Sequence, residues 1–170
     1  HGWIGIKYQL IPGGEPNEII MHVRLHDKTN QQQQLALGIL GVNLIYGAFE
    51  YWSDPRKLIE TLLDELSWER TEIDYIHFAG PQYIGVDNRL MMLHLVTLGH
   101  TEAAMFDAGG APVIPAEVLY KKNVMVQRGN FRPPTNLHFD MTRAAINKFV
   151  EALMLAAYKA DKKYACRNRS

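Results

Sequence analysis

The most apolar segment of the chain, residues 35–49, narrows the possible folds more than any other feature of the sequence. A helix that crosses a bilayer needs about 20 apolar residues, whereas this run is interrupted by Asn43 and followed by a glutamate. We therefore expect no membrane span or membrane partner, but a helix that is apolar all round and buried within the protein. Gly38, Gly41 and Gly47 would let a neighbouring element approach closely. Since each glycine costs about 1 kcal/mol of helix propensity relative to Ala, a subunit contact is an alternative role for this helix.

The N-terminal region has the alternation of a β-hairpin. Residues 3–10 and 18–25 place apolar side chains at every second position, which is typical of strands. The loop between them contains two prolines and two glycines, which allow the chain to reverse. On the other face of the second strand, His22, Arg24 and His26 either line a polar site or face solvent.

Capping residues predict the bounds of two later helices. Asp54 and Pro55 favour a helix start, since Asp accepts hydrogen bonds from free N–H groups and Pro has no N–H at the first helical position. Residues 58–66 continue this helix with an apolar face. A further helix over residues 90–98 should end at Gly99, because glycine readily adopts the left-handed conformation that ends helices.

Between these helices, the sequence predicts a strand over residues 73–78 that is buried on both faces. Ile73, Tyr75 and His77 would lie on one face, and Ile76 with Phe78 on the other. The remaining predicted elements are a hairpin formed by residues 102–106 and 113–114, a helical turn at 115–120, a strand at 123–127 and a final helix from about residue 140.

This order of elements predicts an α/β or α+β fold. We expect a mixed sheet of about five strands, including the N-terminal hairpin, covered by about four helices. A length of 170 residues suits a single domain over residues 1–170. Because His1 leads into a strand without an initiating Met, we interpret the chain as an excerpt of a longer protein.

Composition limits the classes of function. Eighteen basic and eighteen acidic residues give no formal net charge, which argues against general nucleic-acid binding. The single cysteine, Cys166, rules out an intrachain disulfide and a cysteine-based zinc site, and this composition suits the cytoplasm. The histidines lack a compact metal-ligand spacing, so we predict no metal site. The sequence identifies no cofactor.

One segment points to a specific chemistry. Residues 129–138 form a Gly-x-Phe-x-Pro turn that leads into a helix start; its characteristic positions are Gly129, Phe131, Pro133, Thr135 and His138. The pattern resembles the phosphate loop of the nucleotidyltransferase superfamily, which includes nicotinate-mononucleotide adenylyltransferases, although Leu137 stands where that family has Gly. The resemblance implies that Thr135 and His138 contact nucleotide phosphates, and we expect Arg132 or Arg128 to lie nearby. A helix N-terminus favours such an anion.

A second candidate site lies in the loop before residue 90. The side chains of interest are Asp87, Asn88 and Arg89, which follow the carboxyl end of a predicted strand, where open α/β sheets place ligands. Alternatively, Asp87 caps the next helix and Arg89 is solvated.

A wider resemblance covers four short segments, residues 2–6, 41–46, 85–90 and 119–122. Together they are similar to a family of longer uncharacterised bacterial proteins, often labelled automatically as nicotinate-nucleotide adenylyltransferase or TonB-dependent receptor. The resemblance implies a bacterial cytoplasmic protein of which this chain is a part.

Two hypotheses about function follow. In the first, the chain is a nucleotide-binding or nucleotidyltransferase-like module, at best similar to nicotinate mononucleotide adenylyltransferases, whose catalytic residues are Thr135 and His138. In the second, it is a non-catalytic assembly domain of a larger bacterial protein. The helix around residues 38–47 and an exposed sheet edge would then contact another copy or a larger assembly. Whether the chain is an enzyme stays open.

Overall fold

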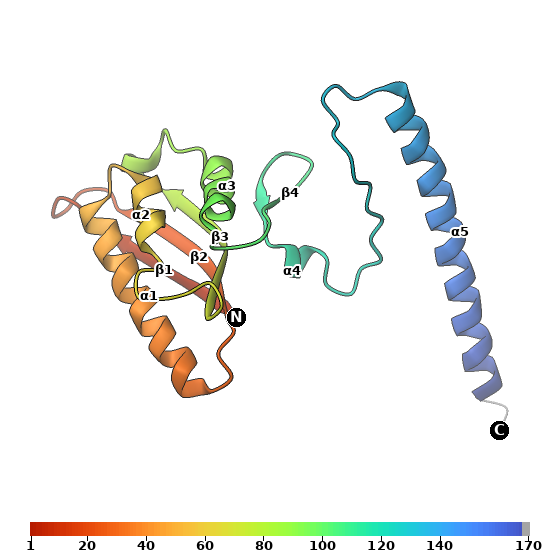
Figure 1. The fold of residues 1–170 in the computed structure, drawn as a ribbon, viewed down its shortest axis with the longest axis horizontal. Coiled ribbons are helices and arrows are strands. Elements are labelled where there is room, and N and C mark those ends of the chain that lie inside the picture. The colour runs from red at the N-terminus through yellow and green to blue at the C-terminus, as the bar shows by residue number, and fades with distance from the viewer. Residues whose placement is uncertain (168–170) are drawn as a thin grey trace. The chain divides into compact units, whose positions relative to one another are not determined.

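The computed structural model describes the backbone of residues 1–167 and the side chains of residues 1–158 (Figure 1). Contacts within the chain divide it into two units, His1–Tyr120 and Lys121–Ser170, and each unit is described by itself. The single domain expected from the length stays a prediction.

The first unit is built on a three-stranded antiparallel sheet. Strands β1 (Gly2–Tyr8) and β2 (Asn17–Leu25) form the predicted hairpin, and β3 (Thr71–Ala79) pairs antiparallel with β2, so the order is β1-β2-β3. The predicted α/β class and the predicted total of about five strands are confirmed. The prediction that these strands form one mixed sheet is wrong. Two consecutive helices between β2 and β3 return the chain in the antiparallel direction, and the last two strands form a sheet of their own.

Helices α1 (Asn30–Glu50), α2 (Pro55–Thr61) and α3 (Asn88–Leu98) share one hydrophobic core with the sheet (Figure 1). The predicted caps are confirmed. The Asp54 carboxylate accepts a hydrogen bond from the Lys57 backbone N–H at 3.2 Å, and Gly99 ends α3 in the left-handed conformation. The largest side chains that are fully buried in this core are Phe78, Ile19, Met21, Leu40, Leu44, Leu58, Ile59, Leu62, Ile73, Ile76, Met92 and Leu95.

Helix α1 is buried on one face only, so the prediction of burial all round is wrong. The sheet and α2 cover the side that carries Leu40, Leu44 and Gly47, whereas the opposite side remains exposed. Of the helix glycines, Gly47 makes the close approach, because a Cβ there would lie 3.0 Å from Leu58 of α2. A Cβ at Gly38 would meet nothing within 4 Å. The core therefore covers only one side of α1, although the helix has apolar residues on both sides.

A bulge in β3 changes the predicted alternation of side chains. His22 pairs with Tyr75 and Val23 with Ile73, so Asp74 lies between these pairs without a partner residue on β2. The extra residue reverses the parity of the strand. Ile73 therefore joins Ile76 in the core, instead of lying on the same face as Tyr75.

The two outer edges of the sheet differ. On β3, the Ile73 N–H donates to the His100 carbonyl at 3.0 Å, and the Ile76 N–H to the Met92 sulfur at 3.3 Å. The Asn88 side chain bonds both polar groups of the Phe78 backbone. No strand among the described residues pairs with the outer edge of β1. One edge is therefore covered and the other is open.

Short elements complete the first unit. The 3₁₀ helix η1 (Pro81–Tyr83) follows β3, and the Tyr83 hydroxyl lies 2.6 Å from that of Tyr8 on β1. The predicted hairpin is confirmed in shorter form as β4 (Met105–Phe106) and β5 (Pro112–Val113), followed by the predicted helical turn, α4 (Pro115–Val118).

The second unit consists of an irregular segment and helix α5 (Asn136–Arg167). The predicted strand at residues 123–127 is wrong. Val124 and Val126 are exposed, and no described strand lies beside them to satisfy a strand's hydrogen bonds. Helix α5 begins four residues earlier than expected, directly after Thr135.

Candidate functional site

The start of α5 brings Thr135 and His138 into contact with each other. The His138 N–H donates to the Thr135 carbonyl at 2.9 Å, and the Thr135 N–H donates to His138 Nδ1 at 2.9 Å. The Thr135 hydroxyl lies 2.8 Å from the same nitrogen. The bond from the Thr135 N–H to the His138 ring is one half of a capping box, with histidine in place of the usual Glu or Gln. In the other half, the His138 N–H bonds the Thr135 carbonyl instead of the Thr135 hydroxyl. His138 thus has a structural role in starting the helix.

The same contacts fix which ring nitrogen of His138 carries the proton. Because Nδ1 accepts from the Thr135 N–H, the neutral ring carries its proton on Nε2. Phe131 packs edge-on against this ring at 5.1 Å between centroids, and a Cβ at Gly129 would lie 3.3 Å from the Phe131 ring. Arg132 and Pro133 are exposed in the turn before the helix.

Asp87 and Arg89 lie together in the first unit. The Asp87 carboxylate caps α3 by accepting from the Arg89 N–H at 3.0 Å, and the Arg89 guanidinium donates to it at 2.7 Å. The side-chain and backbone hydrogen bonds from Arg89 lower the pKa of Asp87 to about 2. The two side chains thus pair their charges and hydrogen-bonding groups with each other at the start of the helix. They belong to a different unit from Thr135 and His138.

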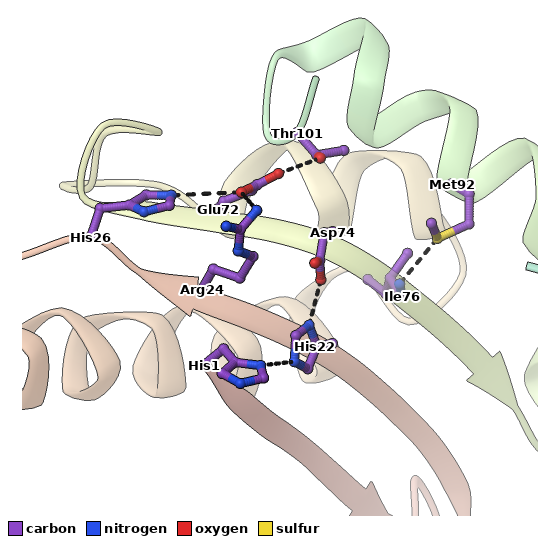
Figure 2. Close-up of polar contacts among 9 residues, drawn as sticks. All are labelled: His1, His22, Arg24, His26, Glu72, Asp74, Ile76, Met92 and Thr101. Carbon is purple, nitrogen blue, oxygen red and sulfur yellow. Dashed lines mark hydrogen bonds and ion pairs between the residues drawn. The ribbon is translucent and has the colours of Figure 1, made fainter. Parts of the chain in front are cut away.

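A buried polar pair joins β2 to β3 on the sheet (Figure 2). His22 Nδ1 donates to the Asp74 carboxylate at 2.6 Å, and both side chains are almost fully buried. His22 Nε2 lies 3.2 Å from Nδ1 of His1, and the Trp3 ring packs edge-on against His22. The sequence singled out His22 but missed Asp74, because the bulge that brings it to His22 becomes visible only with the register of the strands.

Glu72 is the centre of a second polar cluster, nearer the end of the same strands (Figure 2). Its carboxylate accepts from the Arg24 guanidinium at 2.9 Å and from the Thr101 hydroxyl at 2.8 Å, and it lies 3.6 Å from His26 Nε2. A cavity of about 400 Å³ opens beside the cluster; it is lined by Arg24, His26, Trp68, Glu72, Gly99, His100, Thr101 and Glu102.

The charges of this cavity do not favour an anion. Arg24 and His26 of its lining both contact Glu72, and Glu102 adds a second carboxylate. His100 is buried and donates from Nε2 to the Ile59 carbonyl at 3.0 Å. Burial lowers the pKa of His100, so the ring is neutral near pH 7. The cavity therefore offers no excess positive charge to a phosphate.

The core leaves one apolar side of α1 uncovered. We call it the α1 outer face; its large side chains, between 52% and 65% exposed, are Leu35, Val42, Ile45, Tyr46 and Phe49. The face adjoins β1, because the Phe49 ring packs against Tyr8 at 5.3 Å between centroids. The sequence indicated that this helix is apolar, but it did not show which side of the helix stays exposed.

The described residues contain no group of three or more His, Cys, Asp or Glu side chains that could hold a metal ion. Within the same part of the chain, none of the helices combines the length and the apolar character needed to cross a membrane.

No protein-family model, curated protein or solved structure matches this chain. The two resemblances stated from the sequence therefore stay predictions.

Proposed function

We propose that the chain is a non-catalytic interaction domain that binds another polypeptide through the α1 outer face. The observation that carries the proposal is the exposure of five large apolar side chains along a single helix face. Contiguous apolar surface of this kind marks interaction sites in soluble proteins. The geometry of the polar clusters supports no comparable site.

The α1 outer face is not required by the fold. The core is closed by Leu40 and Leu44 on the opposite side of the helix, where both are almost fully buried. The helix is also held to the segment directly after α2 by Asn43, whose side-chain amide donates to the carbonyls of Leu62 and Asp64. These contacts leave the outer face free to bind a partner.

Site-specific photo-crosslinking in the native host tests the proposal. A photoreactive phenylalanine replaces Val42 on the α1 outer face in one variant, and in the control it replaces Ile84, which is 87% exposed after η1. We expect an adduct of defined mass from position 42 and none from position 84. Equal crosslinking at the two positions, or none at either, would contradict the proposal.

A second candidate is nucleotide binding at the start of α5. It is supported by the geometry of His138, whose Nε2–H is left as a donor while Nδ1 is held by Thr135. This donor lies in the first turn of a helix, where backbone N–H groups favour a phosphate. The resemblance of the loop to the nucleotidyltransferase motif adds to this support.

Calorimetry with ATP and with nicotinate mononucleotide tests the second candidate on the full chain. We expect binding heat that is lost in His138→Ala and retained in His26→Ala, a control histidine outside the loop. Absence of heat with both nucleotides would remove the candidate, and so would equal heat from the two variants.

A further inference from the structure

We infer that the partner of the α1 outer face is a second copy of this chain, and that the two copies pair their β1 strands across a two-fold axis. The inference rests on the proposed function and names its partner. Pairing of the two strands would join both three-stranded sheets into one continuous antiparallel sheet.

The first support is the difference between the sheet edges. His100, Met92 and Asn88 cover the outer edge of β3. The outer edge of β1 has no partner strand in the part of the chain that the structure describes. An edge strand presents unpaired N–H and C=O groups that can template pairing with another chain. A second copy would supply these groups with partners.

The second support is that β1 is complementary to itself. Its central residue is Gly5, so an axis there pairs all seven residues of Gly2–Tyr8 with those of the second copy. Ile4 then faces Ile6 of the second copy on the core side, and Trp3 faces Lys7 on the other side. Lys7 is the only charged residue of the strand, so no like charges meet. A lysine beside a tryptophan that is 55% exposed is a favourable cation–π pair.

The third support is the position of α1 relative to the open edge. The helix contacts both β1 and β2 on the core side of the sheet (Figure 1). Paired strands lie about 4.8 Å apart. A helix seated over the gap between β1 and β2 would therefore lie about 10 Å from its symmetry mate, close to the usual distance of 8–10 Å between packed helices. The operation that pairs the two β1 strands thus also brings the two α1 helices together.

The side of α1 nearest β1 suits such a helix contact. Gly41 lies beside Ile4, with 4.0 Å between a Cβ at this glycine and the Ile4 side chain, and Gly38 has open space around it. Ile45 and Phe49 continue this flank and are both about half exposed. Small residues beside large ones let two helices approach closely and interlock. The contact would also account for the two glycines that the monomer does not use for packing.

Disulfide trapping tests the strand register. The background is the full chain with Cys166→Ser. In the double variant Trp3→Cys, Lys7→Cys, the cysteine at position 3 of one copy faces the cysteine at position 7 of the other. Their Cα separation is within the range that a disulfide accepts. We expect oxidation to give a covalent dimer on a non-reducing gel. Each single variant should stay monomeric on that gel. A double variant that remains monomeric, or singles that crosslink equally well, would overturn the strand pairing.

Sedimentation equilibrium of the full chain tests the dimer itself. We expect the wild-type chain to form a dimer. Ile45→Glu should raise the dimer Kd roughly tenfold or more, because a charge would be buried at the contact. Ile84→Glu should keep the wild-type Kd. A wild-type chain that is monomeric at its highest soluble concentration would overturn the inference. If Val42 then still crosslinks to another protein in the host, the proposed interaction function survives; if it does not, both fall.

Discussion

The side-chain amide of Asn88 bonds both polar groups of the Phe78 backbone. The Phe78 N–H donates to Asn88 Oδ1 at 2.8 Å, and Asn88 Nδ2 donates to the Phe78 carbonyl at 3.1 Å. One side chain at the start of α3 thus takes the place of a residue in a neighbouring strand. It connects the helix to the outer edge of β3.

We expect Asn88→Ala to lower the free energy of unfolding by about 2 kcal/mol, because two partly buried hydrogen bonds are lost at about 1 kcal/mol each. Urea denaturation followed by circular dichroism measures this change. Asn30→Ala, at an exposed position in the first turn of α1, is the matched control and should change stability by less than about 0.5 kcal/mol. Equal effects of the two variants would show that the Asn88 bridge does not stabilise the fold.

Two glycines with positive φ should differ in their response to alanine. A Cβ at Gly80, where φ is 113°, would lie 2.7 Å from the Asn17 Cα, whereas a Cβ at Gly99, where φ is 74°, would meet nothing within 4 Å. We expect Gly99→Ala to cost about 1 kcal/mol through backbone strain alone. Gly80→Ala should cost about 3 kcal/mol or more, since overlap with backbone atoms adds to the strain. Similar urea midpoints for the two variants would contradict this explanation.

His100 should make stability depend on pH. Burial lowers the pKa of His100 below its ordinary value of 6.5, so the unfolded chain binds this proton more tightly than the folded protein. The contribution to stability is complete above the unfolded value and is lost as the pH falls through the folded pKa. Gln keeps an N–H donor for the Ile59 carbonyl but does not titrate.

We therefore expect the wild type to lose more stability than His100→Gln between about pH 7.5 and pH 5, the range in which histidines change charge. Urea midpoints measured across this range give the two slopes. Parallel curves for wild type and variant would show that another group causes the dependence.

Thr135 and His138 should act as one unit at the start of α5. We expect Thr135→Ala to weaken the first turn by about 1 kcal/mol, because the contact of its hydroxyl with His138 Nδ1 is lost, and to speed amide exchange in that turn about fivefold. His138→Ala should have a similar effect, and the double variant should add little to either one because their contact is shared. Lys148→Ala, farther along the helix, is the control. Additive effects on exchange would rule out a common cap.

Local chemistry made much of the fold predictable. Asp54 with Pro55 and Gly99 mark helix ends by mechanisms that act within one or two turns, and the hairpin of β1 and β2 follows from an alternation confined to each strand. The contacts at the start of α5 are also local. Thr135 and His138 are three residues apart, so their meeting needs only a helix to begin there.

The features that the sequence did not predict depend on contacts between residues that lie far apart in the sequence. Asp74 reaches His22 through a bulge that only the register of β2 and β3 defines. Val124 and Val126 have the composition of a strand, but no neighbouring strand within the described residues pairs with them. Likewise, the apolar pattern of α1 cannot show that the core covers only one side of the helix.

The unequal edges of the sheet also limit how an assembly of this chain can grow. If both edges were open, each added copy would leave a new free edge, and the sheet could extend into a fibre. Because Asn88, Met92 and His100 occupy the β3 edge, the meeting of two β1 edges leaves no place for a third copy. Because the β3 edge is covered, assembly through the β1 edge stops at two copies instead of continuing as aggregation.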